Sequence, residues 1–331
     1  GGATAAARIR RLDENAEIIV FERSGYISYA NCGLPYYIGG VIEDPEALTL
    51  QTPKSFFSRF RVNMKVHHEV TAIHPHKKTV SVCNLENGEI FEESYDKLLL
   101  SPGAKPTQPA LPGTGAKQVF TLRTVEDTFR IKEYINTYHP RSAILAGGGF
   151  ISLELAENLQ KLGIKITIVQ RPKHLMNPFD PDMASFIHGE MRRHGIELLL
   201  GHTVEGFEEK NGGVDVLLKD KAPLHGDMVI LAIGVTPDTQ LAKAAGLALG
   251  IKGSILVNDR METSVPDIYA VGDAVQIKHY VTGQDALLSL AGPANKRGRI
   301  AADNICGGDS RYRGSLGSSV IKLFDPTAAS T

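Results

Sequence analysis

One sequence unit, a short buried strand followed by a glycine-rich turn and a helix, most constrains the fold of this chain. The strand Ser142–Ala146 leads into Gly147-Gly148-Gly149-Phe150-Ile151-Ser152, and after a helical pattern the next strand covers Ile164–Val169. The turn matches G-x-G-x-x-G/A except at its last position, where Ser152 is still small. Glycines let the backbone approach a pyrophosphate, and the helix N-terminus donates N–H groups to it. The unit therefore predicts a dinucleotide site, the alternative being a turn that serves only packing.

The same unit occurs in incomplete form at the start of the chain. Gly1 and Gly2 open a helical pattern that runs to Leu12, and the strand Glu17–Glu22 ends in an acid. An acid about 20 residues after the turn is typical of dinucleotide-binding units. The first strand and first glycine of the unit are absent, so the chain is expected to begin inside it. Two such units predict an α/β protein with two Rossmann-like nucleotide-binding domains.

The end of the second unit bears on which nicotinamide nucleotide is preferred. Its strand ends in Gln170, and Arg171 and Lys173 follow where an acid would bind a free ribose 2′-hydroxyl. An arginine at this place accommodates the 2′-phosphate of NADPH. The pattern favours NADPH, and the alternative is that both basic side chains are merely solvated.

Three further segments have the form of buried strands ending in small-residue turns. They are Tyr95–Ala104, Met228–Val235 and Asp267–Ala274. In the last of them, Asp273 either binds a ribityl hydroxyl or caps a following helix. The spacing alone leaves both interpretations open.

Length and charge exclude several classes of protein. A chain of 331 residues favours two or more domains. Its 36 basic and 37 acidic residues nearly cancel, which argues against a nucleic-acid or membrane-surface partner. No apolar run approaches the length of about 18 residues that a membrane span needs, and no secretory leader is visible. We therefore expect a soluble, cytoplasmic protein.

The three cysteines are too far apart for a zinc ribbon or a disulfide scaffold, and no metal site is expected. Cys83 lies in an alternating strand and Cys306 near a helix end, so both are interpreted as buried apolar residues. Cys32 differs because a helix start with Pro35 in its first turn follows it. A helix N-terminus lowers the pKa of a thiol, so Cys32 is the candidate nucleophile.

With these features in place, the chain resembles the flavin-dependent pyridine nucleotide-disulfide oxidoreductases. Within that family it looks most like the CoA-disulfide reductases and the related CoA-persulfide or polysulfide reductases. The most specific marker is the cysteine segment, Ser28-Tyr29-Ala30-Asn31-Cys32-Gly33-Leu34-Pro35-Tyr36. The other markers are spread over the whole chain: Gly1–Arg11, Phe21-Glu22-Arg23, His68-Glu69-Val70, Leu100–Ala104, Leu122-Arg123, Gly147–Ser152, Val271–Ala274 and Leu290–Asn295.

The resemblance implies three sets of binding residues around the catalytic Cys32. For FAD these are Gly1, Gly2, Glu22, Arg23, Asn31, Val70, Ser101, Gly103, Arg123, Gly272, Asp273, Pro293 and Ala294. For NAD(P)H they are Gly147, Gly149, Phe150, Ile151, Glu154, Gln170, Arg171 and Gly234. For a CoA moiety they are Arg8, Arg11, Ser28, Tyr29, Asn31, Asn295 and Arg299. The phosphates of CoA suit arginines, although Arg8 and Arg11 alone would indicate a solvated helix face.

The resemblance also implies a domain order. Residues 1–115 and 243–316 are expected to form a FAD-binding domain, and residues 116–242 an NAD(P)H-binding domain, each with three ββα layers. Residues 317–331 are expected to begin a dimerisation domain that is otherwise missing. In this family that domain makes the homodimer and brings tyrosines from the partner to the thiol site.

The expected reaction is reduction of CoA-disulfide, or of a CoA-persulfide or polysulfide, at the expense of NAD(P)H. Relatives with an internal redox disulfide have a second cysteine five positions on, where this chain has Tyr37. The second sulfur is therefore expected from a small-molecule thiol or disulfide. One alternative is an NADH oxidase or peroxidase that uses a Cys32 sulfenic acid. Another is a flavin-bound redox sensor or partner-binding protein.

Overall fold

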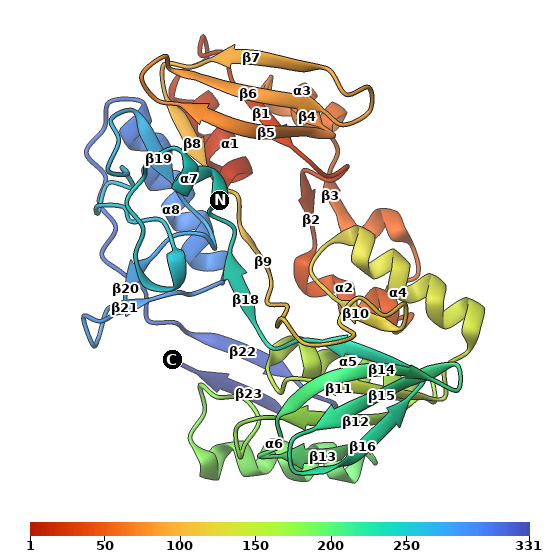
Figure 1. Ribbon diagram of the computed structural model, residues 1–331. Coiled ribbons are helices and arrows are strands. Elements are labelled where there is room, and N and C mark those ends of the chain that lie inside the picture. Colours follow the sequence, from red (N-terminus) through yellow and green to blue (C-terminus); the bar gives the residue numbers. More distant parts are fainter.

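A five-stranded parallel sheet lies at the centre of one half of the molecule, drawn at the bottom of Figure 1. The structure is a computed structural model that describes all 331 residues. The strand order is β10-β17-β11-β12-β13. These strands are β10 (Val119–Thr121), β17 (Met228–Leu231), β11 (Ser142–Ala146), β12 (Lys165–Gln170) and β13 (Glu197–Leu200). Because every neighbouring pair is parallel, all carboxyl ends lie at the same edge.

The two faces of this sheet are covered differently. Leu145 and Ile168 pack with the helices, whereas Ile144 and Val169 pack with a second, antiparallel sheet. The helices are α4 (Val125–Tyr138), α5 (Phe150–Lys161) and α6 (Pro181–Arg193). The second sheet consists of β14 (Val204–Lys210), β15 (Gly213–Leu218) and β16 (Lys221–Gly226). Alternation along the strands thus produces the expected three ββα layers.

The other half of the molecule combines two parallel strand pairs with an antiparallel sheet. The pairs are β1 (Ile19–Glu22) with β4 (Asn63–Val66), and β8 (Leu98–Leu100) with β19 (Ile268–Ala270). The antiparallel sheet is β5 (His68–His74), β6 (Thr79–Asn84) and β7 (Ile90–Ser94). Around them lie α1 (Gly2–Leu12), α3 (Pro53–Phe60), α7 (Gln240–Ala244) and α8 (Ala291–Ile305). Helices α1 and α8 pack side by side.

Three expected strands are shorter in the structure than the sequence predicted. The segments Tyr95–Ala104, Met228–Val235 and Asp267–Ala274 are strands only over β8, β17 and β19, respectively. Gly103 and Gly234, with φ of 72° and 112°, turn the chain out of the sheet in a conformation that glycine adopts readily. The chain then crosses between the halves as β9 (Ala104–Pro106) and β18 (Val235–Pro237), which pair antiparallel.

The last described residues pack against the half that contains the parallel sheet. The hairpin β22 (Ser319–Lys322) and β23 (Thr327–Ser330) contributes Ile321 and Leu323 to its core. Smaller elements complete the chain. They are β2 (Ser28–Tyr29), α2 (Leu34–Ile38), β3 (Thr49–Gln51), β20 (Ile277–Lys278), β21 (Asp285–Ala286), and 3₁₀ turns at Asn31–Gly33, Pro45–Leu48 and Ile251–Gly253. None of the helices is long and apolar enough to cross a membrane.

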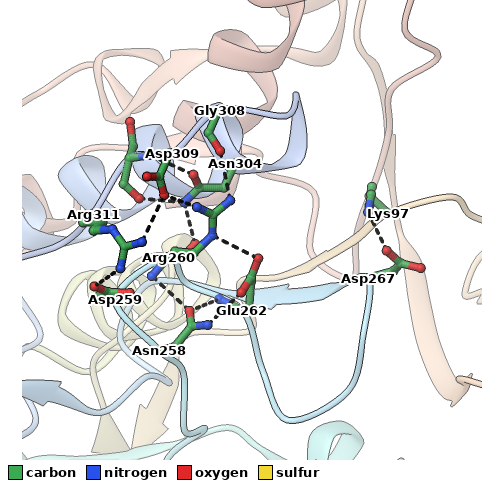
Figure 2. A network of polar contacts seen from close by, with 11 residues as sticks. Lys97, Asn258, Asp259, Arg260, Glu262, Asp267, Asn304, Gly308, Asp309 and Arg311 are labelled. Carbon is green, nitrogen blue, oxygen red and sulfur yellow. Dashed lines mark hydrogen bonds and ion pairs between the residues drawn. The ribbon is translucent and has the colours of Figure 1, made fainter.

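A polar network fastens the C-terminal end of α8 to a neighbouring loop (Figure 2). Arg260 is at its centre, forming ion pairs with Glu262 and Asp309 and donating to the Gly308 carbonyl. Asn304 of α8 donates to the Arg260 carbonyl at 2.9 Å. Each charged side chain of this cluster, Arg311 and Asp259 included, has an ion-pair partner within it, so the cluster serves the fold.

Candidate functional site

The glycine turn between β11 and α5 requires glycine for two separate reasons. Gly147 has φ of 114°, and a Cβ there would lie 2.3 Å from the Ala232 carbonyl oxygen. A Cβ on Gly148 would lie 2.5 Å from the Leu175 side chain. Gly149, the N-cap of α5, has no such neighbour within 4 Å, and no side chain caps the helix. The first N–H groups of α5 therefore have no side-chain partner and suit an anion.

The tertiary structure brings together most of the residues predicted for NAD(P)H. Gly147, Gln170 and Gly234 follow or end β11, β12 and β17, which are adjacent in the sheet. The Gln170 side chain is buried and lies against Gly148, whereas Arg171 is exposed at the rim. Phe150, Ile151 and Glu154 occupy the first turns of α5. Ligands of open α/β sheets bind at this carboxyl edge.

The first glycine turn forms a second close-packed site. Gly1 lies so near Val271 that a Cβ would approach that side chain to 2.8 Å. The Gly2 N–H donates to Ser101 Oγ at 3.1 Å, and Gly272 follows β19 with φ of 84°. Residues that are far apart in the sequence thus gather around the start of α1.

Asp273 pairs with Arg123 beside this turn. The distance between Arg123 Nη2 and Asp273 Oδ2 is 2.6 Å, and the two side chains are only 19% and 15% exposed. No helix follows Asp273, because the next regular element is β20. The helix-cap interpretation is therefore wrong, and the carboxylate is positioned by an arginine that lies just after β10.

The acid at the end of β1 is partly committed to its own loop. Glu22 Oε1 accepts from the Ser24 N–H at 2.8 Å. Arg23 pairs with Asp238 at 2.9 Å and approaches Glu69 at 3.8 Å. These contacts hold the loop after β1 near β5, which carries Val70, and near the point where β18 ends.

The residues predicted for CoA lie mostly along the contact between α1 and α8. Thr4 Oγ1 donates to Asn295 Oδ1 at 2.5 Å, and Arg8 pairs with Asp303 at 2.8 Å. Arg11 and Arg299 are exposed and form no ion pair. Arg8 is therefore not the solvated cation that its helix suggested, while Arg11 and Arg299 remain free to meet phosphate groups.

Ser28, Tyr29 and Asn31 lie apart from that helix contact, in β2 and in the 3₁₀ turn that holds the cysteine. The Tyr29 hydroxyl donates to the Arg123 carbonyl at 3.4 Å. Pro293 and Ala294 are in the first turn of α8. The residues predicted for CoA thus fall into two groups, one on α1 and α8 and the other in the segment that precedes α2.

Cys32 is exposed, and no disulfide involves it. It lies in the 3₁₀ turn Asn31–Gly33, and α2 follows with Pro35 in its first turn, as the sequence predicted. The expected lowering of its pKa is wrong. Partial desolvation of the thiol, and then the negative charge of Glu154, raise the pKa of Cys32. The helix that follows has only five residues.

The other two cysteines were both expected to be buried, and neither is fully buried in the structure. Cys83 is half-buried in β6, whereas Cys306 is exposed. The prediction of a buried Cys306 is wrong because the residue is the C-cap of α8, beyond the last turn whose side chains meet the core.

Sequence reasoning missed several residues at these sites. Thr4 and Asp303 complete the contact between α1 and α8, and Asn158 donates to the Glu154 carbonyl at 2.8 Å. A signal for Asp303 exists, since Asn295, Arg299 and Asp303 recur every four residues along one helix face. Thr4 has no local signal, because its partner lies on another helix.

A family model for "Pyridine nucleotide-disulphide oxidoreductase" matches residues 1–286. This chain belongs to that family. Its Rossmann-type α/β fold and its class, an oxidoreductase, are thereby established, and the resemblance drawn from the sequence is confirmed.

Individual members of the family are also similar. Coenzyme A disulfide reductase of Staphylococcus aureus is 38% identical over 331 residues, which are 100% of this chain and 74% of that protein. The crystal structure of reduced CoADR-RHD from Bacillus anthracis has a TM-score of 0.97 and 50% identity. It is matched by 99% of this chain, which spans only 59% of that longer chain.

More distant relatives include an NAD-dependent persulfide reductase from A. fulgidus, with 33% identity and a TM-score of 0.95. The match covers 99% of this chain and 62% of that one. A water-forming NADH oxidase from Lactobacillus brevis has 32% identity and a TM-score of 0.94, covering 99% and 72%. Of these three structures, CoADR-RHD has the highest sequence identity to this chain, at 50%.

Proposed function

We propose that this chain is the nucleotide-binding part of a FAD-dependent NAD(P)H:disulfide oxidoreductase that reduces CoA-disulfide or a CoA-persulfide through Cys32. The observation that carries the proposal is the placement of this cysteine. It precedes α2, which packs on α5, the helix opened by the second glycine turn. The similarity to coenzyme A disulfide reductase over the whole chain supports the substrate class.

The residues at the first turn fit FAD. A Cβ on Gly1 would lie 2.8 Å from Val271 and one on Gly2 3.2 Å from Ser101, and glycine at such turns lets the backbone approach a pyrophosphate. Glu22 at the end of β1 suits a ribose hydroxyl, and Asp273 suits a ribityl hydroxyl. When bound, FAD would carry electrons from the nicotinamide nucleotide to sulfur. The chain's own part is to position these groups.

NADPH is the nicotinamide nucleotide that we favour. The buried Gln170 and the exposed Arg171 replace the acid that would select a free 2′-hydroxyl. An engineered form of the Lactobacillus brevis oxidase, bound to NADPH, has neighbouring Asp-to-Ala and Ala-to-Arg changes among its substitutions. Gln170 and Arg171 of this chain follow the same pattern, a neutral side chain followed by an arginine.

Cys32 supplies the covalent chemistry. Its thiolate would attack one sulfur of the substrate disulfide, forming a mixed disulfide while the second thiol leaves as a thiolate. Two electrons must then reduce that mixed disulfide to restore Cys32 and release the remaining thiol. Tyr37 stands where an internal partner cysteine would be, so the substrate provides the second sulfur. The exposed guanidinium groups of Arg11 and Arg299 would bind phosphates of the CoA moiety.

The proposal includes the organisation of the protein. Residues 1–115 and 243–316 would form the FAD-binding domain, and residues 116–242 the NAD(P)H-binding domain. Residues 317–331 would begin the dimerisation domain of a homodimer that works in the cytoplasm. The longer chains of the relatives support this arrangement, because their matches leave 26% and 41% of those proteins uncovered.

The NADH oxidase reaction is the second candidate, favoured by the similarity to the Lactobacillus brevis enzyme. Stopped-flow reoxidation of the reduced protein by CoA-disulfide, H₂O₂ and O₂ separates the two. We expect CoA-disulfide to be the fastest oxidant. Faster reoxidation by O₂ or peroxide would favour a Cys32 sulfenic acid instead.

The direct test is the Cys32→Ser variant, with Cys306→Ser as the matched control at another exposed cysteine. We expect Cys32→Ser to keep its flavin and to lose disulfide reduction by about a hundredfold or more, because its hydroxyl is a far weaker nucleophile. Cys306→Ser should retain activity. Full activity in Cys32→Ser would refute the assignment.

A further inference from the structure

His188 of α6 accepts a hydrogen bond from the backbone of the segment that follows β12. The Leu175 N–H donates to His188 Nε2 at 3.0 Å. Leu175 is fully buried, whereas the imidazole is half-buried. A ring nitrogen accepts a hydrogen bond only when it carries no proton. The contact therefore joins α6 to this segment only while the imidazole is neutral.

The same segment, residues 171–176, packs on the glycine turn between β11 and α5. The Met176 N–H donates to the Gly148 carbonyl at 2.8 Å. The Leu175 side chain is so close that a Cβ on Gly148 would lie 2.5 Å from its Cδ2 atom. Arg171 is exposed at the start of the segment. The position of this arginine relative to the glycine turn thus depends on how the segment is held.

The backbone of the segment is strained at its last residue. Met176 has φ of 53°, in the left-handed region that residues other than glycine rarely adopt. Such a conformation persists where the surrounding contacts impose it. Here two successive N–H groups are held from outside the segment, that of Leu175 by His188 and that of Met176 by Gly148. Loss of the His188 contact should let the segment relax away from the turn.

The charged groups around His188 favour its neutral form. Burial, and then the positive charges of Arg192 on α6 and of His174 on the segment, lower the pKa of His188. Strand β13 also packs on α6. Its acidic side chain, Glu197, accepts from Thr167 Oγ1 at 3.2 Å. At neutral pH the imidazole is therefore uncharged and able to accept.

We propose that His188 is a positioning residue of the nicotinamide nucleotide site, whose neutral imidazole holds segment 171–176 against the glycine turn and so places Arg171 for a ribose 2′-phosphate. The proposal rests on the NADPH preference proposed above. His188 acts through the segment and not by contact with the nucleotide. Protonation of Nε2 would replace the acceptor by a donor and leave the buried Leu175 N–H without a partner. Nucleotide binding should therefore weaken as the pH falls through the pKa of His188.

Binding of NADP⁺ to the purified holoenzyme tests the proposal. Isothermal titration calorimetry gives the Kd without turnover, because NADP⁺ cannot reduce the oxidised flavin. His188→Leu removes the acceptor, whereas His188→Gln keeps a neutral acceptor oxygen at every pH. His76→Leu is the matched control, at an exposed histidine between β5 and β6 in the other half of the molecule.

His188→Leu should raise the Kd for NADP⁺ by about three- to tenfold near neutral pH, and the Kd values of His188→Gln and His76→Leu should match that of the unaltered protein. Amide hydrogen exchange over residues 171–176 should be faster in His188→Leu alone. An unchanged Kd in folded His188→Leu would overturn the proposal, even with faster exchange, because the histidine would then serve only the packing.

The pH profile gives a second test that does not depend on the folding of the leucine variant. Between about pH 8 and about pH 5.5, the Kd of the unaltered protein should rise more steeply than that of His188→Gln, because glutamine does not titrate. The phosphate of NADP⁺ titrates equally in both experiments. Parallel profiles would contradict the role of His188. Tighter binding of NAD⁺ than of NADP⁺ by the unaltered protein would instead refute the nucleotide preference, so the two failures are distinguishable.

Discussion

At the scale of single residues, Arg171 is the side chain through which the nucleotide preference is most directly testable. Arg171→Glu should raise the KM for NADPH by about tenfold or more, because a carboxylate repels the 2′-phosphate that a guanidinium attracts. The KM for NADH should change little. Steady-state kinetics with both nucleotides measures the effect.

Lys165→Glu provides the control for that charge reversal. Lys165 is exposed at the opposite end of β12, so the same change of charge there should leave both KM values in place. An equal loss with NADH and NADPH in Arg171→Glu would contradict recognition of a 2′-phosphate.

At the scale of elements, the contact between α2 and α5 depends on one small residue. Gly39 has ordinary helical backbone angles, and the three atoms nearest to an alanine Cβ there would all belong to Asn158. Gly39→Ala should lower the free energy of unfolding by about 1–3 kcal/mol. Adding Asn158→Ala should recover part of that loss, because the obstructing side chain is gone.

Gly189→Ala makes a matched control for this prediction. Gly189 lies within α6, where a Cβ would meet nothing within 4 Å, and alanine should stabilise that helix by about 0.5–1 kcal/mol. Denaturant unfolding of Gly39→Ala, Asn158→Ala, the double variant and Gly189→Ala gives the comparison. If the effects of Gly39→Ala and Asn158→Ala simply add, the contact does not determine the spacing of the two helices.

At the scale of the whole molecule, Glu157 joins the chain end to the parallel-sheet half. Its carboxylate accepts from the Phe324 N–H, and the Phe324 ring stacks on His194 at 3.6 Å between centroids. Glu157→Ala would leave a buried N–H without a partner, which costs about 1–3 kcal/mol. Residues 319–331 should then exchange amide hydrogens faster and be cleaved sooner by proteases.

The comparison for that change is Glu133→Ala, which removes an exposed carboxylate from the same half of the molecule. Its hydrogen exchange over residues 319–331 should match that of the unaltered protein. Unchanged protection of the hairpin in Glu157→Ala would show that Ile321 and Leu323 alone hold it in place.

The sequence by itself determined the features that depend on neighbouring residues. The glycine turn at Gly147–Ser152, the strand before it, the helix after it and the start of α2 at Pro35 were predicted because backbone conformation and hydrophobic alternation are local properties. The lack of a cysteine five positions after Cys32 was likewise plain from the chain.

Only the tertiary structure decided the properties that depend on partners distant in the chain. It paired Arg8 with Asp303 and Arg123 with Asp273, and it exposed Cys306. The pKa of Cys32 was mispredicted for the same reason. A local helix start suggested a lower value, whereas desolvation and a charge brought in by packing raise it, since electrostatic energy depends on distance in space and on burial.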